Sequence, residues 1–462
     1  MHGPPVCPQI AMPGAPVRAP EDPVPEIRPF RALRYDPAVV GDLAPIVAPP
    51  YDVIGPQLRE TLLARHPRNA VRLDLPVGEP GEDPDERYRR VARAFAAWRT
   101  DGTLRKDPRP GVYVYEQAYR VPGTGVDRTQ RGFFARLRLE PFGPGSGVLP
   151  HERTMSGPKE DRYRLLRATG TNTSPVVGLY EDRDRAASGR LAAVAGTDPA
   201  VAVTDDDGVH HRLWVVPDDG TTTGDAATLV AAAGAGPVFI ADGHHRYETA
   251  IRYRDERRMT RSCEVDPPFD FVLMLFLDAA DQLTVLPTHR VVRGLGADGL
   301  AGLRAGLDGL FEVRPAVESD LVGRYEAAGQ LAGGAGRLAL LTRDGAWELV
   351  ARRAAFAGLG SGGGAALRSL DVWLLGAALE ALAGIDAAAA AGGQRIAYTK
   401  SAAEAAAMVS AGTDGADAAF LLEPTPVASI LAVAGEGDVM PQKSTYFYPK
   451  ALTGLVFNPH EW

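Results

Sequence analysis

Apolar positions along the chain follow helical spacing in some stretches and strand spacing in others. Four apolar residues within 85–100 recur in steps of three and four, which predicts an amphipathic helix. Residues 111–120 and 131–140 alternate between apolar and polar instead, with a PGTG turn between them, and predict a pair of strands. Because helices and strands alternate along the chain, we expect an α/β or α+β fold.

The same patterns predict further elements on both sides of this region. Further helices are expected at residues 58–66, 246–258, 402–409 and 426–434. Further strands are expected at residues 70–75, 176–180, 212–216, 237–241, 271–277, 283–287 and 418–422, of which 271–277 and 283–287 are expected to pair with each other. The polar, charged stretch 149–174 carries no predicted helix or strand, and residues 151–154 within it are expected to be a loop.

Composition narrows the class of protein. The net charge is −8, and the chain holds no dense run of Lys and Arg, which disfavours binding to nucleic acid and to membranes. Two cysteines in 462 residues fit a reducing compartment, and no apolar run approaches the length of a membrane span. We therefore expect a cytoplasmic protein, and we identify no signal peptide in the Pro-rich N-terminal stretch.

The most informative motif joins a short apolar strand to a helix. The strand 237–241 is followed by Asp242, Gly243, His244, His245 and Arg246, and a helix begins at once. The first N–H groups of a helix lack partners within it and attract anions, and a glycine lets the backbone approach closely with φ > 0. Arg246 can hold phosphate oxygens, and the histidines add donors that also carry protons. The alternative is that Asp242 merely caps the helix and the histidines are solvated.

Lysine is scarce in this arginine-rich chain. It occurs only at Lys106, Lys159, Lys400, Lys443 and Lys450. A lysine kept in such a chain suggests a position that the forked guanidinium does not fit. Lys159, Lys443 and Lys450 lie within motifs. Lys159 and Lys443 are expected to neutralise phosphate charge, and a role for Lys450 is left open, with chance retention on the surface as the competing explanation for all three.

A charged segment supplies candidate catalytic groups. His151 and Glu152 precede Arg153, and Lys159 follows shortly after. Together with Asp242, we assign His151, Glu152 and Lys159 to catalysis, with Glu152 or Asp242 as general base or metal ligand. An ordinary solvated loop with internal salt bridges would look the same.

Two further sets complete the candidate site. Lys443, Ser444 and Thr445 combine a cation with hydroxyl groups and resemble the ingredients of a phosphate cradle, without the glycines of a P-loop. Asp52 follows a rigid Pro-Pro-Tyr turn, where it either points into a cleft or caps the next helix. We assign Asp52, Arg153 and Asn172 to substrate binding, and no residue to metal binding.

Several blocks resemble a known family. The segments FRALRYDP, VVGDLAPIVAPPYDVI, LPHERTMSGPKEDRYRLLRAT, ADGHHRYETA and VMPQKSTYFYPKALTGLVF are similar to the bacterial and archaeal family of unknown function numbered 1015, from about Phe30 to Phe457. The short DGHHR turn also resembles the phosphate-binding turn of the ParB/sulfiredoxin superfamily, which includes the free-serine kinases. The first resemblance implies phosphoserine chemistry, because genes of that family often lie beside serine-biosynthesis genes. The second implies a nucleotide-binding unit around the turn.

With these resemblances we divide the chain into five segments. Residues 1–26 are expected to be a disordered Pro-rich tail, 27–185 an N-terminal α+β domain, 186–299 the ParB/sulfiredoxin-like unit that contains DGHHR, 300–393 an Ala/Gly-rich supporting subdomain, and 394–462 a C-terminal α/β segment.

Three functions compete. We favour a nucleotide-dependent phosphotransferase that acts on a small hydroxylated metabolite, with free L-serine as the favoured acceptor. A non-catalytic, ParB-like nucleotide switch and a phosphohydrolase of a small phosphorylated metabolite are the alternatives. ATP or ADP is the expected cofactor, with another nucleotide left open, and Mg²⁺ is expected to accompany its phosphates. The expected partners are the nucleotide and a small-molecule substrate, and the oligomeric state is left open, a homodimer included.

Overall fold

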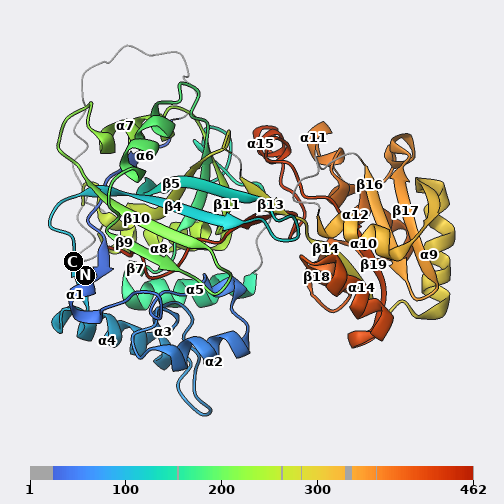
Figure 1. Ribbon diagram of the computed structural model, residues 1–462, viewed down its shortest axis with the longest axis horizontal. Helices are drawn as coiled ribbons and strands as arrows, with labels where there is room; N and C mark the ends of the chain where they lie inside the picture. The colour runs from blue at the N-terminus through green and yellow to red at the C-terminus, as the bar shows by residue number, and fades with distance from the viewer. Residues whose placement is uncertain are drawn as a thin grey trace, which may run out of the picture.

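The chain forms two lobes that lie side by side along the long axis of the molecule (Figure 1). The computed structural model describes residues 24–152, 156–261, 264–281, 283–327, 336–360 and 362–460, with the backbone alone for 156–158. Most of the predicted N-terminal tail lies outside the described residues. Of the helices in the described ranges, none is long and apolar enough to cross a membrane.

The first lobe is built on a large mixed sheet. Within the described residues its order is β6 (Val148–Leu149), β11 (Val238–Asp242), β8 (Val176–Tyr180), β12 (Phe271–Asp278), β5 (Asp127–Arg138), β4 (Gly111–Arg120), β10 (His210–Pro217) and β9 (Val201–Thr204), with β1 (Ile27–Arg28) paired to β5. Neighbouring strands are antiparallel except for the pairs β11–β6 and β12–β8, which are parallel. The predicted domains 27–185 and 186–299 both contribute strands to this one sheet. Their division into two domains stays a prediction.

Helices cover both faces of this sheet. All eight residues of β12 are buried, as expected of a central strand between two layers. One face packs against α5 (Ser156–Thr169), α6 (Ala186–Ala195), α7 (Asp225–Ala233) and α8 (His244–Thr260). The other face packs against α4 (Glu86–Thr100), near which lie α1 (Pro37–Val40), α2 (Pro56–Arg65), α3 (Val71–Asp74) and the small sheet of β2 (Leu33–Tyr35) and β3 (Leu104–Lys106).

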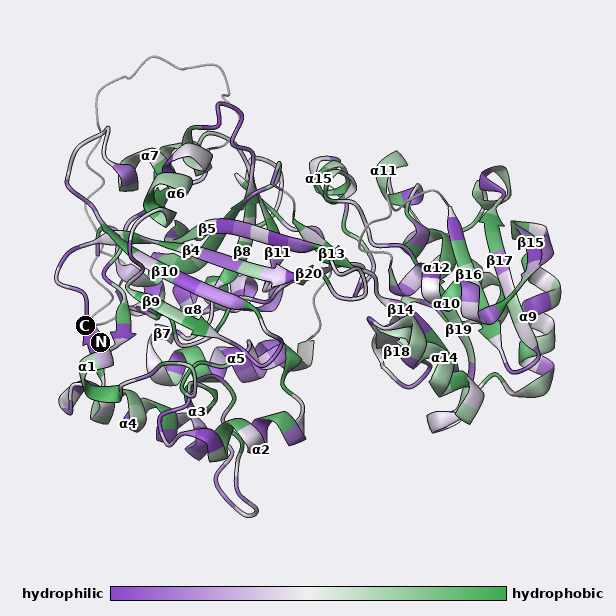
Figure 2. Ribbon diagram, viewed as in Figure 1, coloured by the Kyte–Doolittle hydropathy of each residue, from purple (hydrophilic) through white to green (hydrophobic). Residues whose placement is uncertain are grey.

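The second lobe has its own antiparallel sheet. Within the described residues its order is β15 (Phe311–Ala316), β17 (Gly345–Ala351), β16 (Arg337–Thr342), β19 (Ala416–Leu422), β14 (His289–Arg293) and β18 (Ile396–Thr399). The apolar residues of β16, β17 and β19 stand out in green in Figure 2. One face packs against α9 (Gly296–Leu310) and α12 (Asp371–Ala383), the other against α10 (Glu318–Glu326) and α14 (Ala402–Ala411). Near the junction with the first lobe lie α11 (Ala365–Arg368) and α15 (Val427–Gly435), and the short helix α13 (Ala387–Ala391) contacts β18.

The chain ends by returning to the first lobe. In this return segment, residues 436–460, β20 (Tyr446–Tyr448) pairs with β13 (Thr284–Leu286), and β21 (Asn458–Pro459) pairs with β7 (Thr171–Asn172). Isolated bridges join Met440 to Glu152 and Phe457 to Leu33. Apolar side chains of the segment, Phe457 among them, are buried in the core of the first lobe. The last residues of the chain therefore hold the two lobes together.

The structure confirms a multi-domain fold of mixed helices and sheets. The predicted helix 85–100 is α4, the strands 111–120 and 131–140 are β4 and the paired strand β5, and the strand and helix around DGHHR are β11 and α8.

The structure differs from the sequence-based expectations in three places. Residues 70–75 form the helical turn α3 instead of a strand, because the Asn69 side chain accepts from the Val71 N–H and donates to the Pro45 carbonyl, which fixes a turn. The stretch 149–174 contains helix α5, whose apolar residues pack against α8 and the sheet. The strands near 271–277 and 283–287 do not pair with each other: β12 lies between β5 and β8, and β13 pairs with β20.

Candidate functional site

A polar cleft of about 530 Å³ lies where the two lobes meet. Its volume is in the range of small-molecule sites. The first lobe contributes the 3-10 helix η1 (Tyr51–Val53), Glu152 and residues 241–245. The second lobe and its connection contribute Thr288, Tyr398, Thr399 and Lys400, and the return segment contributes Lys443, Thr445, Tyr446 and Lys450.

The strand–turn–helix of the DGHHR motif forms one wall of the cleft. Strand β11 ends at Asp242, Gly243 has φ = 85°, and α8 begins at His244. A Cβ at Gly243 would lie 2.9 Å from Arg246 Nε and 3.2 Å from Val176 Cα, so a side chain there meets both strain and close contacts. The glycine thus lets the N-terminus of a 17-residue helix open onto the cleft.

Asp242 lies between two cations. Its Oδ2 is 3.0 Å from Arg246 Nη2, and its Oδ1 is 3.2 Å from Lys450 Nζ. Burial alone would raise the pKa of this carboxyl, but Lys450 and Arg246 hold the pKa of Asp242 below its ordinary value. Asp242 is therefore an ionised group that positions Lys450, and it does not cap α8 by a side-chain hydrogen bond.

Arg246 does not line the cleft. Its side chain is buried, donates to the Pro175 carbonyl, pairs with Asp242 and lies 3.7 Å from Asp52. The guanidinium also lies 5.8 Å from the centre of the Tyr51 ring. These contacts fix the positions of Asp52 and Asp242, both of which line the cleft. For Arg246 to bind phosphate, as the sequence predicted, its guanidinium would have to break these contacts with Asp52 and Asp242.

Glu152 joins the first lobe to the return segment. It forms a bridge with Met440, and its Oε1 accepts a hydrogen bond of 3.1 Å from the Lys443 N–H. Burial raises the pKa of Glu152 to about 7, despite the opposing effect of that hydrogen bond and of the Lys443 charge. Near neutral pH this carboxyl can therefore both accept and release a proton.

His151, which precedes Glu152, and His244, which begins α8, are both neutral. His151 is fully buried; its Nδ1 faces the Ile240 carbonyl and therefore carries the proton, so Nε2 accepts from the Thr445 hydroxyl at 3.0 Å. Burial lowers the pKa of His151 to about 4. His244 Nε2 accepts from the His151 N–H at 3.3 Å, and burial together with His151 holds the pKa of His244 well below its ordinary value. Of the two, His244 lines the cleft and His151 does not.

Three of the five lysines of the chain line the cleft. Lys400 Nζ and Lys450 Nζ lie 4.0 Å and 4.4 Å from the centre of the Tyr446 ring, and Lys443 adds a third ammonium. Lys443 has φ = 57°, a left-handed conformation that is uncommon outside glycine. The sequence pointed to Lys443, left a role for Lys450 open and gave none to Lys400. The scarcity of lysine was the signal that could have found them.

The remaining predicted residues divide between the cleft and its surroundings. Asp52, His245 and Thr445 line the cleft. Ser444 lies behind it, where its hydroxyl donates to the Pro441 carbonyl at 2.5 Å, and Lys159 pairs with Glu248 beside it. Arg153 lies outside the described residues.

Asn172 is part of the core, away from the cleft. Its Oδ1 accepts from the Leu273 N–H at 3.1 Å, from Asn458 Nδ2 at 2.9 Å and from His460 Nε2 at 3.1 Å. This oxygen ties β7 and β12 to the return segment. The geometry assigns Asn172 a structural role instead of the predicted contact with substrate.

Aromatic residues of the cleft were not predicted from the sequence. Tyr51, Tyr398 and Tyr446 all line it. Within the described residues no group of three or more His, Cys, Asp and Glu side chains is arranged to hold a metal ion.

The cleft, the helix N-terminus and the lysines define a two-lobed protein with an anion-attracting site at the lobe junction. The chain belongs to the family described as "Protein of unknown function (DUF1015)", whose model matches residues 27–373, more than half of the 462 residues. This match confirms the predicted family. It ends before the block at 439–457, for which the resemblance stays a prediction.

Solved structures give only weak likenesses. A conserved hypothetical protein from Pyrococcus furiosus is 14% identical, with a TM-score of 0.32 over 65% of this chain and 87% of that one. A free serine kinase in complex with AMP is 13% identical, with a TM-score of 0.33 over 65% of this chain and 83% of that one. SbnI from Staphylococcus aureus is 11% identical, with a TM-score of 0.33 over 67% of this chain and 83% of that one. No curated protein matches. At these TM-scores the likenesses carry no argument about function.

Proposed function

We propose that the cleft binds a nucleotide through its phosphates and transfers a phosphoryl group to a small hydroxylated metabolite, with free L-serine as the favoured acceptor. One observation carries the proposal: the open N-terminus of α8 and three lysines line the same cleft. Backbone N–H groups and ammonium groups are what phosphoryl transfer requires, because positioning and charge stabilisation supply most of its catalysis.

The phosphates would lie against the turn and the lysines. The N–H groups at the start of α8 and the donors of His244 and His245 face the cleft, and Lys443 and Lys450 lie across it from the return segment. Because His244 Nε2 accepts from His151, its Nδ1 is the nitrogen that donates. Thr445, with its hydroxyl held by His151, is a further contact.

Glu152 would be the general base. The acceptor hydroxyl gives its proton to the Glu152 carboxylate while its oxygen attacks the terminal phosphorus. The P–O bond to the nucleoside phosphate breaks, and the charge left on that phosphate is neutralised by Lys443 and Lys450. A base with a pKa of about 7 is matched to work near neutral pH.

Asp242, His151 and Arg246 act through other groups in this proposal. Asp242 orients Lys450, His151 orients the Thr445 hydroxyl, and Arg246 holds Asp242 and Asp52. We assign them as positioning residues.

In this proposal Mg²⁺ would bind in the cleft together with the phosphates of the nucleotide. Asp52 is the cleft carboxylate that is neither ion-paired to a lysine nor assigned as the base, and it offers the oxygen ligand that Mg²⁺ prefers. The ion would supply charge neutralisation at the phosphates. Asp52 would contribute one ligand, and the phosphates would contribute others.

Detection of phosphoserine tests the proposal. The full chain is incubated with L-serine and Mg²⁺ and with ATP, ADP or CTP in turn, and product is measured by mass spectrometry, with Glu152→Gln as the matched variant. Phosphoserine formed by the wild type and strongly reduced in the variant supports a kinase. Nucleotide binding without product for any hydroxylated acceptor supports the switch, and phosphate release from phosphoserine without nucleotide supports the hydrolase.

A further inference from the structure

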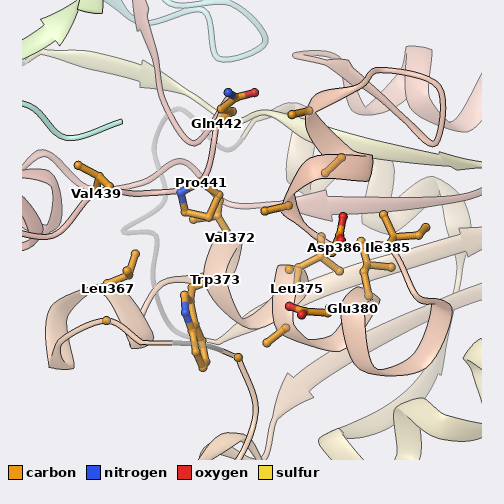
Figure 3. A pocket seen from close by; sticks show the side chains of 18 of the residues that line it. Leu367, Val372, Trp373, Leu375, Glu380, Ile385, Asp386, Val439, Pro441 and Gln442 are labelled. Carbon is orange, nitrogen blue, oxygen red and sulfur yellow. The ribbon is translucent and has the colours of Figure 1, made fainter. Parts of the chain in front are cut away.

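A second cavity, of about 680 Å³, lies in the second lobe next to the cleft (Figure 3). It is lined by α12, α13, β18 and residues 437–442 of the return segment, among others. Apolar side chains dominate its wall, with Trp373, Leu375 and Ile385 among them. Tyr398 lines both this cavity and the cleft. An apolar cavity of this size is typical of a small-molecule site.

One cation lies in this apolar wall. Arg290 is 6% exposed and lines the cavity. Its Nη1 donates to the Thr288 carbonyl at 2.5 Å, its Nη2 donates to the Lys443 carbonyl at 3.4 Å, and its guanidinium lies 5.7 Å from the centre of the Tyr398 ring. The guanidinium has further N–H donors beyond these two.

Arg290 differs from the other deeply buried arginines near the site. Arg162 pairs with Asp161 and Asp74, and Arg246 pairs with Asp242. Across the ranges that the structure describes, no carboxylate forms an ion pair with Arg290. Burial lowers the pKa of Arg290 to about 10, despite the opposing effects of Tyr398 and of the Glu152 carboxyl, whereas the pKa of Arg246 is raised by its carboxylate neighbours. A buried cation without a paired carboxylate is costly, and a bound anion would offset that cost.

The rest of the wall narrows the chemistry of the anion. A planar carboxylate suits the fork of a guanidinium, and the apolar wall suits a hydrocarbon body. The cavity also carries three carboxylates, Glu380, Asp386 and Asp438. Figure 3 shows Glu380 and Asp386 with Ile385 on one part of the wall, and Pro441 and Gln442 on another. A second negative charge on the ligand would meet repulsion from these groups.

We propose that this cavity binds a small amphipathic monocarboxylate, whose carboxylate pairs with Arg290 and whose apolar body packs against Trp373, Leu375 and Ile385. This cavity adjoins the nucleotide cleft and shares only Tyr398 with it among the lining residues. The proposal does not depend on the proposed phosphoryl transfer.

Titration of the full chain with paired probes tests this site. The probes are 4-phenylbutyrate and octanoate, each compared with its neutral primary amide, in isothermal calorimetry without nucleotide. Because a charge-assisted hydrogen bond is lost in the amide, we expect each carboxylate to bind at least about tenfold more tightly than its amide.

Two variants locate the bound probe. Arg290→Met removes the cation and keeps an unbranched side chain. Gly376→Leu fills the cavity from α12: Gly376 lines it, a Cβ there meets nothing within 4 Å, and leucine favours a helix more than glycine does. Both variants are expected to bind the carboxylates at least about tenfold more weakly. Arg304→Met is the matched control, because Arg304 lies over Trp347 outside the cavity, and it is expected to bind as the wild type does.

Circular dichroism and thermal melting establish that each variant is folded before binding is compared. Failure of both carboxylates to bind the folded wild type would overturn the proposal. Binding that survives in both variants would place the probe elsewhere and also overturn it, as would a loss in Gly376→Leu with none in Arg290→Met.

Discussion

Glu152 has two roles whose effects can be separated: it contacts the return segment and it faces the cleft. We expect Glu152→Gln to lower kcat by roughly 100-fold or more, because the amide cannot accept the acceptor proton, while its oxygen can still accept from the Lys443 N–H. Nucleotide affinity should change little. Steady-state kinetics and a nucleotide titration measure the two quantities, and an equal loss in both would contradict the role as base.

The same carboxyl sets a pH dependence. Its pKa is raised to about 7 by burial, and a general base works in the ionised form. The rate should therefore rise as the pH increases through about 7 and fall tenfold per pH unit below it. Single-turnover rates between pH 5.5 and 8.5 measure this profile. A rate that is flat across this range would mean that another group accepts the proton.

Lys450 is the cleft lysine that pairs with Asp242 at the helix turn. Lys450→Met should weaken nucleotide binding by about tenfold, since it removes an ammonium from the cleft and leaves Asp242 to repel phosphate. Lys106→Met is the matched control, because Lys106 lies outside the cleft. Equal affinities of the two variants would show that Lys450 does not contact the nucleotide.

At the scale of single residues, the sequence predicted part of the candidate site. It pointed to Glu152 through a charged segment, to Lys443 through the scarcity of lysine, and to the DGHHR residues through a strand that is followed at once by a helix. It could not tell that Arg246 turns inward or that Asn172 belongs to the core. Side-chain direction depends on partners such as Pro175 and Asn458 that are distant in the chain.

The element that matters most for the cleft is the turn between β11 and α8. Gly243→Ala should lower the free energy of unfolding by roughly 2–4 kcal/mol, since it adds left-handed strain to close contacts with Arg246 and Val176. Gly384→Ala is the control: φ there is 64° and a Cβ meets nothing within 4 Å, so strain alone should cost about 1 kcal/mol. Urea denaturation measures both, and equal losses would mean that the turn tolerates a side chain.

Elements with strong periodicity were predictable and short ones were not. Helix α4 buries Tyr88, Val91 and Phe95 on one stripe, and its pattern alone revealed it. Helix α3 has four residues, too few for a period, and its conformation depends on hydrogen bonds made by Asn69. The pairing of β13 could not be predicted from the sequence either, because its partner β20 lies some 160 residues further along the chain.

For the molecule as a whole, Asn172 anchors the return segment. We expect Asn172→Ala to lower the free energy of unfolding by about 2–4 kcal/mol, because one oxygen accepts three hydrogen bonds whose buried donors would lose it. The KM values for nucleotide and acceptor should stay unchanged in the folded fraction. A raised KM with an unchanged free energy of unfolding would instead support the prediction that Asn172 contacts the substrate.

The assembly of the cleft could not be predicted from sequence. Its lining comes from residues near 51, 152, 242, 398 and 445, which no local pattern connects. Contacts at such separations are set by the topology of two sheets and a returning chain end.

That returning end has a consequence for synthesis on the ribosome. Chains are made from the N-terminus, and a domain generally folds once its residues have emerged. Here Phe457 bridges to Leu33, and Lys443 and Lys450 reach the cleft from a segment that follows the second lobe in the chain. The first lobe and the lining of the cleft are therefore completed only after the ribosome has made the whole second lobe.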